Sequence, residues 1–205
     1  MVARQLQRRD IIDQRVLDVM AEVPRERFIS PEHHHEAYAD RPVPIGCGQT
    51  ISQPYIVALM VQHLRVGSGH RVLDVGAGSG YQTAILAKLA KEVFAIERIA
   101  ALASRARATL AELALDNVTI TVADGTLGWA AHAPFDRIIC GAAGPDVPQL
   151  WIDQLVDGGR IVMPTGGRDI QTLIALEKRG VKTARVNICG VRFVHLIGQQ
   201  GWADG

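Results

Sequence analysis

The stretch Val72-Leu73-Asp74-Val75-Gly76-Ala77-Gly78-Ser79-Gly80 joins strand-forming residues directly to three glycines at alternate positions. Apolar residues at helical spacing follow it, at positions 81, 85 and 89. The glycines therefore lie between a buried strand and the N-terminus of a helix. Glycine tolerates unusual backbone angles and brings no Cβ, and a helix end has free N–H groups, so this turn is typical of a ligand-binding loop.

Two classes of ligand use such a turn. A dinucleotide site needs G-x-G-x-x-G, whereas this chain has G-x-G-x-G, with Tyr81 in place of the last glycine. Both classes need an acid at the end of the second strand, and the strand at 93–97 supplies Glu97, which could hold two ribose hydroxyls. Glu97 therefore does not separate the two classes.

Three further features favour S-adenosylmethionine, which has no phosphate to bind. They are Asp74 inside the first strand, the spacing of Gly78 and Gly80, and the turn Ala123-Asp124-Gly125 after the third strand. A nicotinamide oxidoreductase and a glycine turn without a ligand are the less favoured alternatives.

Composition indicates an ordinary folded protein. The 205 residues are 48% hydrophobic and 21% charged, with a net charge of +1, which gives no indication of disorder, a nucleic-acid partner or a membrane surface. We expect one domain over 1–205, with N-terminal helices and an active-site loop in 1–65, a cofactor-binding core in 66–165 and C-terminal strands in 166–205. The first thirty residues lack the apolar core of a secretory signal, so we expect a cytoplasmic protein.

Neither the cysteines nor the histidines predict a metal site. Cys47, Cys140 and Cys189 are odd in number and far apart, so they form neither a disulfide framework nor a zinc motif. In His33-His34-His35, neighbouring side chains point in different directions, and we expect no metal there.

Strand and helix patterns alternate along the chain, which predicts a parallel sheet with right-handed crossovers. The C-terminal part lacks a long helix, so the sheet should finish with a partly antiparallel end. Strands are expected at 72–75, 93–97, 118–122, 136–140, 160–163, 170–176 and 191–196, and helices at 3–23, 54–64, 81–91, 102–113 and 151–156.

A long irregular segment is predicted at 39–54, rich in Pro and Gly and poor in charge. Such segments inside compact domains are more often functional than idle. Ser52 stands just before the helix that opens at Pro54, so its hydroxyl could simply cap that helix or could belong to an active site. The residues alone leave these two interpretations equal.

Several stretches together resemble the protein-L-isoaspartate (D-aspartate) O-methyltransferase family over nearly the whole chain. The glycine turn is common to many methyltransferases, whereas Gly48-Gln49-Thr50-Ile51-Ser52-Gln53-Pro54-Tyr55 is far more specific. Further similar stretches are residues 23–28, 37–42, 81–82, 124–125, 133–136, 154–159 and 191–194.

The resemblance implies a Rossmann-like, class I S-adenosylmethionine-dependent methyltransferase with a mostly parallel seven-stranded sheet. The implied reaction methylates the free carboxylate of L-isoaspartyl residues in damaged proteins or peptides, and the ester then collapses to a succinimide. The family name adds D-aspartyl residues as a further implied acceptor. Ser52 falls on the family's active-site serine. Thr50, Ile51 and Gln53 frame Ser52 and are assigned to cofactor binding. The remaining implied cofactor residues are Asp74, Gly76, Gly78, Gly80, Glu97, Asp124 and Gly125, with Glu97 on the ribose and Asp124 near the adenine amine.

The chain departs from the family pattern at Cys140-Gly141-Ala142-Ala143-Gly144, where many members have a threonine and alanines. It also has His195 where a proline is usual, and we interpret His195 as a core histidine rather than as a pocket residue. Two other functions stay open, and the departures allow the first of them. One is a carboxyl methyltransferase acting on a biosynthetic peptide or small molecule, and the other is a non-catalytic cofactor-binding module.

Overall fold

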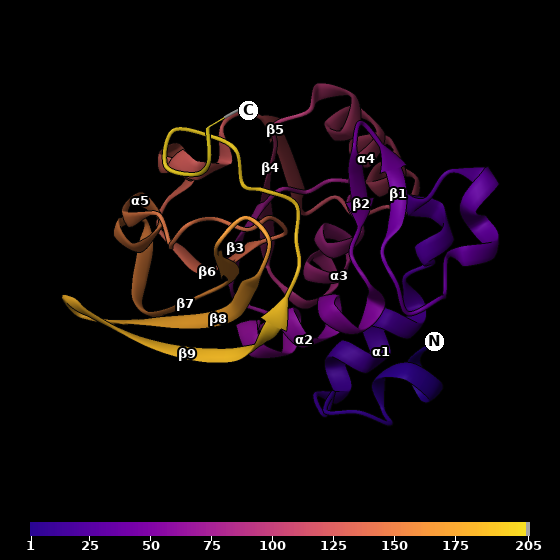
Figure 1. The fold of residues 1–205 in the computed structure, drawn as a ribbon, viewed down its shortest axis with the longest axis horizontal. Coiled ribbons are helices and arrows are strands. Elements are labelled where there is room, and N and C mark those ends of the chain that lie inside the picture. The colour runs from indigo at the N-terminus through magenta and orange to yellow at the C-terminus, as the bar shows by residue number, and fades with distance from the viewer. Residues whose placement is uncertain (204–205) are drawn as a thin grey trace.

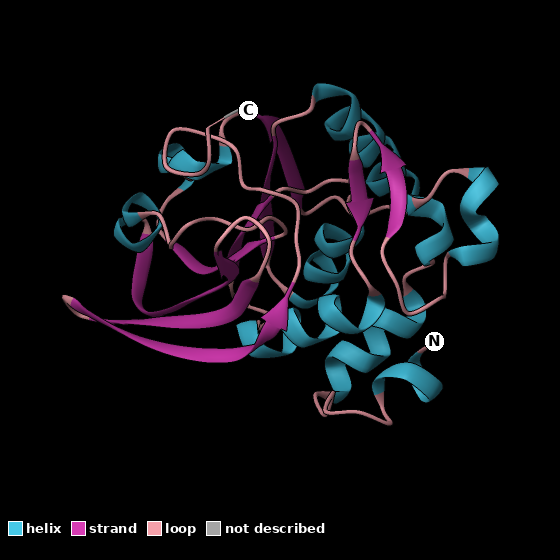
Figure 2. Ribbon diagram, in the orientation of Figure 1, coloured by secondary structure: helices cyan, strands magenta, loops and turns pink. Residues whose placement is uncertain are grey.

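A seven-stranded sheet forms the centre of the molecule (Figures 1 and 2). The computed structural model describes residues 1–203. The sheet consists of β3 (Arg71–Val75), β4 (Glu92–Glu97), β5 (Val118–Val122), β6 (Phe135–Cys140), β7 (Leu155–Gly166), β8 (Gln171–Arg179) and β9 (Lys182–Val191).

The strand order is β5-β4-β3-β6-β7-β8-β9. The first five strands are parallel, whereas β8 pairs antiparallel with both β7 and β9. The chain winds outward from β3 to β5 and then returns to place β6 on the other side of β3. Ligands of open parallel sheets bind where the winding reverses, beyond the strand ends. Gly76 after β3 and Gly141 after β6 lie at this point.

Helices cover both faces of the sheet because its central strands are apolar on both sides. In β3, Val72 belongs to one core cluster, while Leu73 and Val75 belong to the other. The first cluster includes residues of α1 (Gln14–Glu22), α2 (Pro54–Leu64), α3 (Tyr81–Leu89) and α4 (Ala100–Glu112). The second includes Trp151 of α5 (Gln149–Asp153) and is bordered by η4 (Gly125–Leu127) and η5 (Ala130–His132).

The central strands and the antiparallel end are confirmed, but the predicted helix over 3–23 is wrong in its first half. A short π-helical turn, η1 (Val2–Leu6), precedes α1, which begins only at Gln14. The backbone N–H groups of Ile12 and Asp13 donate to Oε1 of Gln62, at 2.7 and 2.9 Å, instead of continuing a helix. The Asp13 side chain then caps α1 by accepting from the N–H of Arg15.

The predicted last strand at 191–196 is also wrong. The strand is β9, which ends at Val191, and residues 192–197 form a loop instead. β9 is an edge strand with mostly exposed or half-exposed residues, so it lacks the apolar run that the sequence pattern requires. Figure 1 shows the β8–β9 hairpin extending from one side of the molecule.

The segment 39–54 is less irregular than predicted, because it contains the antiparallel hairpin of β1 (Val43–Gly46) and β2 (Gln49–Ile51). Two short 3-10 helices, η2 (Arg25–Phe28) and η3 (Pro31–Glu36), precede it. The strands are only four and three residues long, and the turn between them needs positive φ at Cys47 and Gly48. Within residues 1–203, no helix is both long and apolar enough to cross a membrane.

Candidate active site

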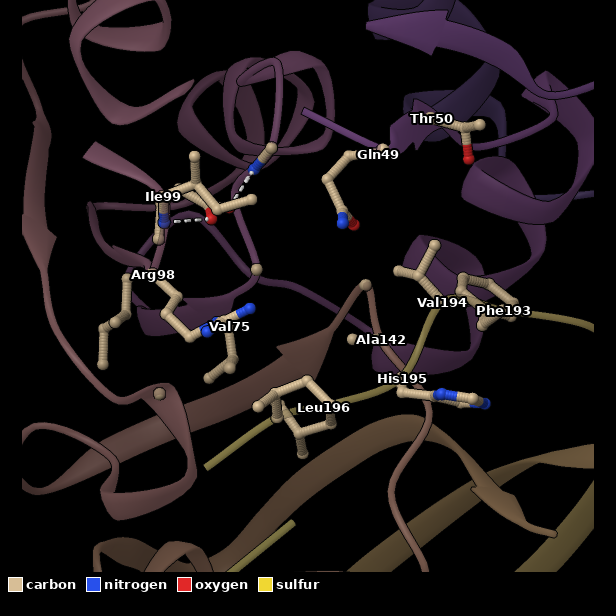
Figure 3. A pocket seen from close by; sticks show the side chains of 18 of the residues that line it. Gln49, Thr50, Val75, Arg98, Ile99, Ala142, Phe193, Val194, His195 and Leu196 are labelled. Carbon is tan, nitrogen blue, oxygen red and sulfur yellow. Dashed lines mark hydrogen bonds between the residues drawn. The ribbon is translucent and has the colours of Figure 1, made fainter. Parts of the chain in front are cut away.

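A cleft of about 480 Å³ opens at the carboxyl ends of β3 and β4, and we call it the large cleft. Figure 3 shows Gln49 and Thr50 of β2 on one side of this cleft and, on the other side, Val194 and Leu196, which follow β9. Ala142, which follows β6, lies between Val194 and Leu196 in this view. The cleft therefore occupies the reversal point of the sheet.

The glycine turn forms part of the floor of the large cleft. The N–H groups of Gly76 and Ala77 both donate to the carbonyl of Ile96, at 2.8 and 3.1 Å, which fixes the turn to β4. Gly76 and Gly78 have φ values of 78° and 56°, which favour glycine. A Cβ at Gly141 would lie 3.1 Å from the carbonyl oxygen of Gly76, so the two loops approach closely only because side chains are absent.

Glu97 is the acid of the large cleft and is 6% exposed. Its Oε2 accepts a hydrogen bond from the N–H of Gly78 at 2.8 Å, and its Oε1 accepts one from the N–H of Ile99 at 2.8 Å. Each carboxylate oxygen has a further lone pair. The carboxylate is thus held in place by the backbone and can still accept hydrogen bonds from two ligand hydroxyls.

Two other predicted residues support the glycine turn and are not among the described residues that line the large cleft. Asp74 is fully buried and accepts hydrogen bonds from Nε2 of Gln82, at 2.8 Å, and Oγ1 of Thr83, at 2.7 Å. Its burial raises the pKa of Asp74 to about 6, and the charge of Glu97 adds to this effect. Gly80 has a φ of 89° and allows α3 to approach α4.

Asp124, the predicted adenine contact, is likewise not among the described residues that line the large cleft. Its Oδ1 accepts hydrogen bonds from the N–H and hydroxyl of Thr126, and its Oδ2 accepts one from the N–H of Gln199 at 2.8 Å. We call residues 196–202 the C-terminal loop. Its Trp202 donates from Nε1 to the carbonyl of Ala143 at 3.2 Å. Asp124 therefore fastens this loop, while the neighbouring Gly125 lines the large cleft.

Ser52 lies where smaller spaces meet the large cleft. A narrow gap of about 40 Å³ lies beside the glycine turn, and a side cleft of about 310 Å³ lies beside Val191 and Phe193. Thr50 and Gly141 line all three spaces, and Ser52 lines the gap and the side cleft. The predicted residues Ile51 and Gln53 line the gap and the side cleft, respectively.

Ser52 is not the cap of α2. The N-cap residue is Gln53, whose side chain makes no capping bond, and the N–H of Tyr55 donates to Oδ1 of Asp40 at 3.2 Å instead. Asp40 Oδ2 also accepts a hydrogen bond from Nε2 of Gln53 at 2.9 Å. Because Asp40 supplies the cap, the capping interpretation of Ser52 is wrong, and a place for Ser52 in an active site stays a prediction.

Arg25 is a residue of this site whose role the sequence patterns did not reveal. It is completely buried, and its Nη2 donates to the carbonyl of Ser52 at 2.7 Å, while Nε donates to the carbonyl of Ala37 at 2.8 Å. The guanidinium lies over the ring of Tyr81, 4.7 Å from its centroid. The one available signal was that Arg25 lies in the stretch 23–28, which resembles the family. Arg25 therefore connects the backbone at Ser52 to Tyr81 of α3.

The departures from the family pattern lie at or beside these spaces. The interpretation of His195 as a core histidine is wrong, because His195 is half-buried and lines the large cleft, with Nε2 3.0 Å from the carbonyl oxygen of Arg168. An isolated parallel β-bridge pairs Ala143 with His195 and places His195 at the wall of the large cleft. Cys140 is fully buried, and burial raises the pKa of its thiol to about 12. Gly144 packs beside Met163 and Leu196.

Comparisons with known proteins agree on one family. Residues 1–201 match the family described as protein-L-isoaspartate(D-aspartate) O-methyltransferase (PCMT). The protein-L-isoaspartate O-methyltransferase of Methanoregula boonei is 52% identical over 204 residues, covering 100% of this chain and 94% of that protein. Protein-L-isoaspartate O-methyltransferase 1 of Syntrophobacter fumaroxidans is 50% identical, covering 98% and 94%. A solved structure of a putative protein-L-isoaspartate O-methyltransferase of Plasmodium falciparum, in complex with S-adenosyl-L-homocysteine, is 28% identical with a TM-score of 0.83, covering 96% of each chain.

Proposed function

Because this chain belongs to the protein-L-isoaspartate (D-aspartate) O-methyltransferase family, we propose that it methylates the free α-carboxylate of L-isoaspartyl residues in damaged proteins, with S-adenosylmethionine as the methyl donor. The observation that carries the proposal is the meeting of the large cleft with the side cleft at Thr50 and Gly141, with Ser52 next to them in the lining of the side cleft and of the gap. A donor and an acceptor bound in these two spaces would face each other there.

The large cleft fits the cofactor. Glu97 offers two fixed acceptors for ribose hydroxyls, and the backbone at Gly76 and Gly78 is open to close approach because no side chain intervenes. We assign Thr50, Ile51 and Gly125 to the same ligand. We assign Asp124 an indirect role, because its carboxylate already holds the C-terminal loop. When bound, S-adenosylmethionine supplies an electrophilic methyl group.

The acceptor needs positioning rather than a base. An α-carboxylate has an unperturbed pKa of about 3.5, so it is already ionised at neutral pH. We propose that the Ser52 hydroxyl donates to this carboxylate and aims it, which orients the nucleophile without neutralising it. Orientation of this kind contributes several kcal/mol to catalysis. Arg25 holds the Ser52 carbonyl and thereby keeps the hydroxyl in place.

The test is methyl transfer from labelled S-adenosylmethionine to a short peptide with one L-isoaspartate, with its L-aspartyl twin as control. We expect transfer to the isoaspartyl peptide alone. Ser52→Ala should lower kcat at least tenfold while the dissociation constant of S-adenosylhomocysteine changes less than about twofold. Ser68→Ala, at an exposed position, is the matched control. No transfer to either peptide, with the cofactor product still bound, would favour a biosynthetic peptide or a small molecule as acceptor. Tight binding without any acceptor would indicate a non-catalytic module.

Acceptance of D-aspartyl residues and a cytoplasmic location stay predictions. The same assay with a D-aspartyl peptide tests the first.

A further inference from the structure

The side cleft has an uneven distribution of charge. Its described lining consists of apolar residues such as Pro42, Ile56 and Val194, neutral polar residues such as Ser52, and a single ionisable residue, Arg192. Arg192 is exposed and also lines the large cleft. Within residues 1–203 its guanidinium has neither a hydrogen-bond nor an ion-pair partner. A cation without a counter-ion therefore stands at the border of the two clefts.

The backbone on both sides of Arg192 is fixed. Val191 pairs with Gln171 as the last residue of β9. On the other side, the N–H of Phe193 donates to Oε1 of the same Gln171 at 2.9 Å. Gln171 is 1% exposed, and its Nε2 donates to the carbonyls of Gly167 and Arg168, at 2.9 and 3.0 Å. The side chain of Arg192 thus extends from a rigid base, which lowers the entropic cost of binding a ligand there.

We propose that Arg192 binds a second carboxylate of the acceptor, next to the isoaspartyl residue, so that the enzyme prefers damaged sites with an acidic neighbour. The proposal rests on the function proposed above. A planar guanidinium suits a carboxylate because it can donate two parallel hydrogen bonds.

The reacting carboxylate itself is a poor partner for Arg192. Methylation converts this carboxylate from an anion into a neutral ester, so a cation bound directly to it would stabilise the substrate more than the transition state. The neutral hydroxyl of Ser52 lies at the junction instead. A neighbouring carboxylate keeps its charge throughout the reaction, and binding it therefore costs nothing in the chemical step.

The test uses two isoaspartyl peptides that differ only in the neighbouring residue, glutamate or glutamine. We expect the unaltered enzyme to have about a fivefold lower KM for the glutamate peptide, the upper size of an exposed charge pair. Arg192→Gln should bring this ratio close to one, and Arg192→Lys should keep part of it. Lys182→Gln, which removes an exposed charge at the far end of β9, is the matched control and should keep the full ratio. Added salt should weaken the preference.

Four outcomes contradict the assignment. The preference could persist in Arg192→Gln, or be absent from the unaltered enzyme. KM could rise equally for both peptides in Arg192→Gln, which would place Arg192 on the reacting carboxylate. The variant could instead lose affinity for S-adenosylhomocysteine with the preference intact, which would place Arg192 in the cofactor site. No transfer to either peptide overturns the proposed function as well, whereas transfer without a preference overturns this assignment alone.

Discussion

Replacing Asp74 with asparagine should make the protein more stable at neutral pH. Asp74 is completely buried beneath the glycine turn, with two neutral hydrogen-bond donors and no cation among its recorded partners in residues 1–203. Its ionised form is therefore poorly compensated, and burial raises its pKa from 3.8 to about 6. Asparagine has the same shape and carries no charge.

The magnitude follows from the two pKa values. The folded protein holds the Asp74 proton more tightly than the unfolded chain, so stability is lost as pH rises from about 4 to about 6, and the full cost remains above that range. The cost at pH 7 is about 3 kcal/mol. The variant does not have this cost. The difference in the free energy of unfolding between variant and unaltered protein should grow by about 2 to 3 kcal/mol from pH 4 to pH 7.

Urea denaturation without cofactor, followed by far-UV circular dichroism at several pH values, measures this difference. Asp116→Asn, at an exposed position, is the matched control. Titrating groups that are distant from Asp74 affect both proteins alike and cancel in the comparison. Parallel stability curves for Asp74→Asn and the unaltered protein across this pH range would refute the reasoning.

Three further substitutions test other parts of the site. Glu97→Gln weakens the acceptor of the Gly78 N–H and of the ribose, so the affinity for S-adenosylhomocysteine should fall about ten- to hundredfold in calorimetry; an unchanged affinity would contradict the role of Glu97. Arg25→Met leaves the Ser52 carbonyl without its donor, so it should cost about 1 to 3 kcal/mol of stability in urea and lower kcat, and an unchanged kcat would argue against positioning. Gly80→Ala forces a left-handed residue, so it should cost about 1 to 2 kcal/mol, measured by thermal melting, and a stability equal to the parent would show that the turn relaxes.

The central sheet could be predicted because its inner strands are rich in apolar residues and end next to a glycine or an acidic residue. Two of these strands, Val72–Val75 and the strand ending at Glu97, are buried on both faces. Their apolar composition therefore identifies them as strands without knowledge of the strands that they pair with. The position of Glu97 in the cleft follows from the same pattern, because ends of parallel strands meet at one edge.

The misplaced elements depend on partners distant in the chain. β9 is recognisable only through its pairing with β8, since its own residues are largely exposed. The role of Ser52 depends on Asp40 taking over the cap of α2, and the direction of the Asp124 carboxylate depends on Gln199. The position of Arg25 could not be predicted either, because nothing in its local sequence places its guanidinium next to the Ser52 carbonyl.

The C-terminal loop also has a consequence for synthesis on the ribosome. The glycine turn and Glu97 emerge early, but the wall at residues 193–197 and the bond from Gln199 to Asp124 form only after residues 193–199 have been translated. A nascent chain thus exposes half of the cleft without its opposite wall. We therefore expect stable retention of the cofactor only once residues 193–199 have emerged from the ribosome.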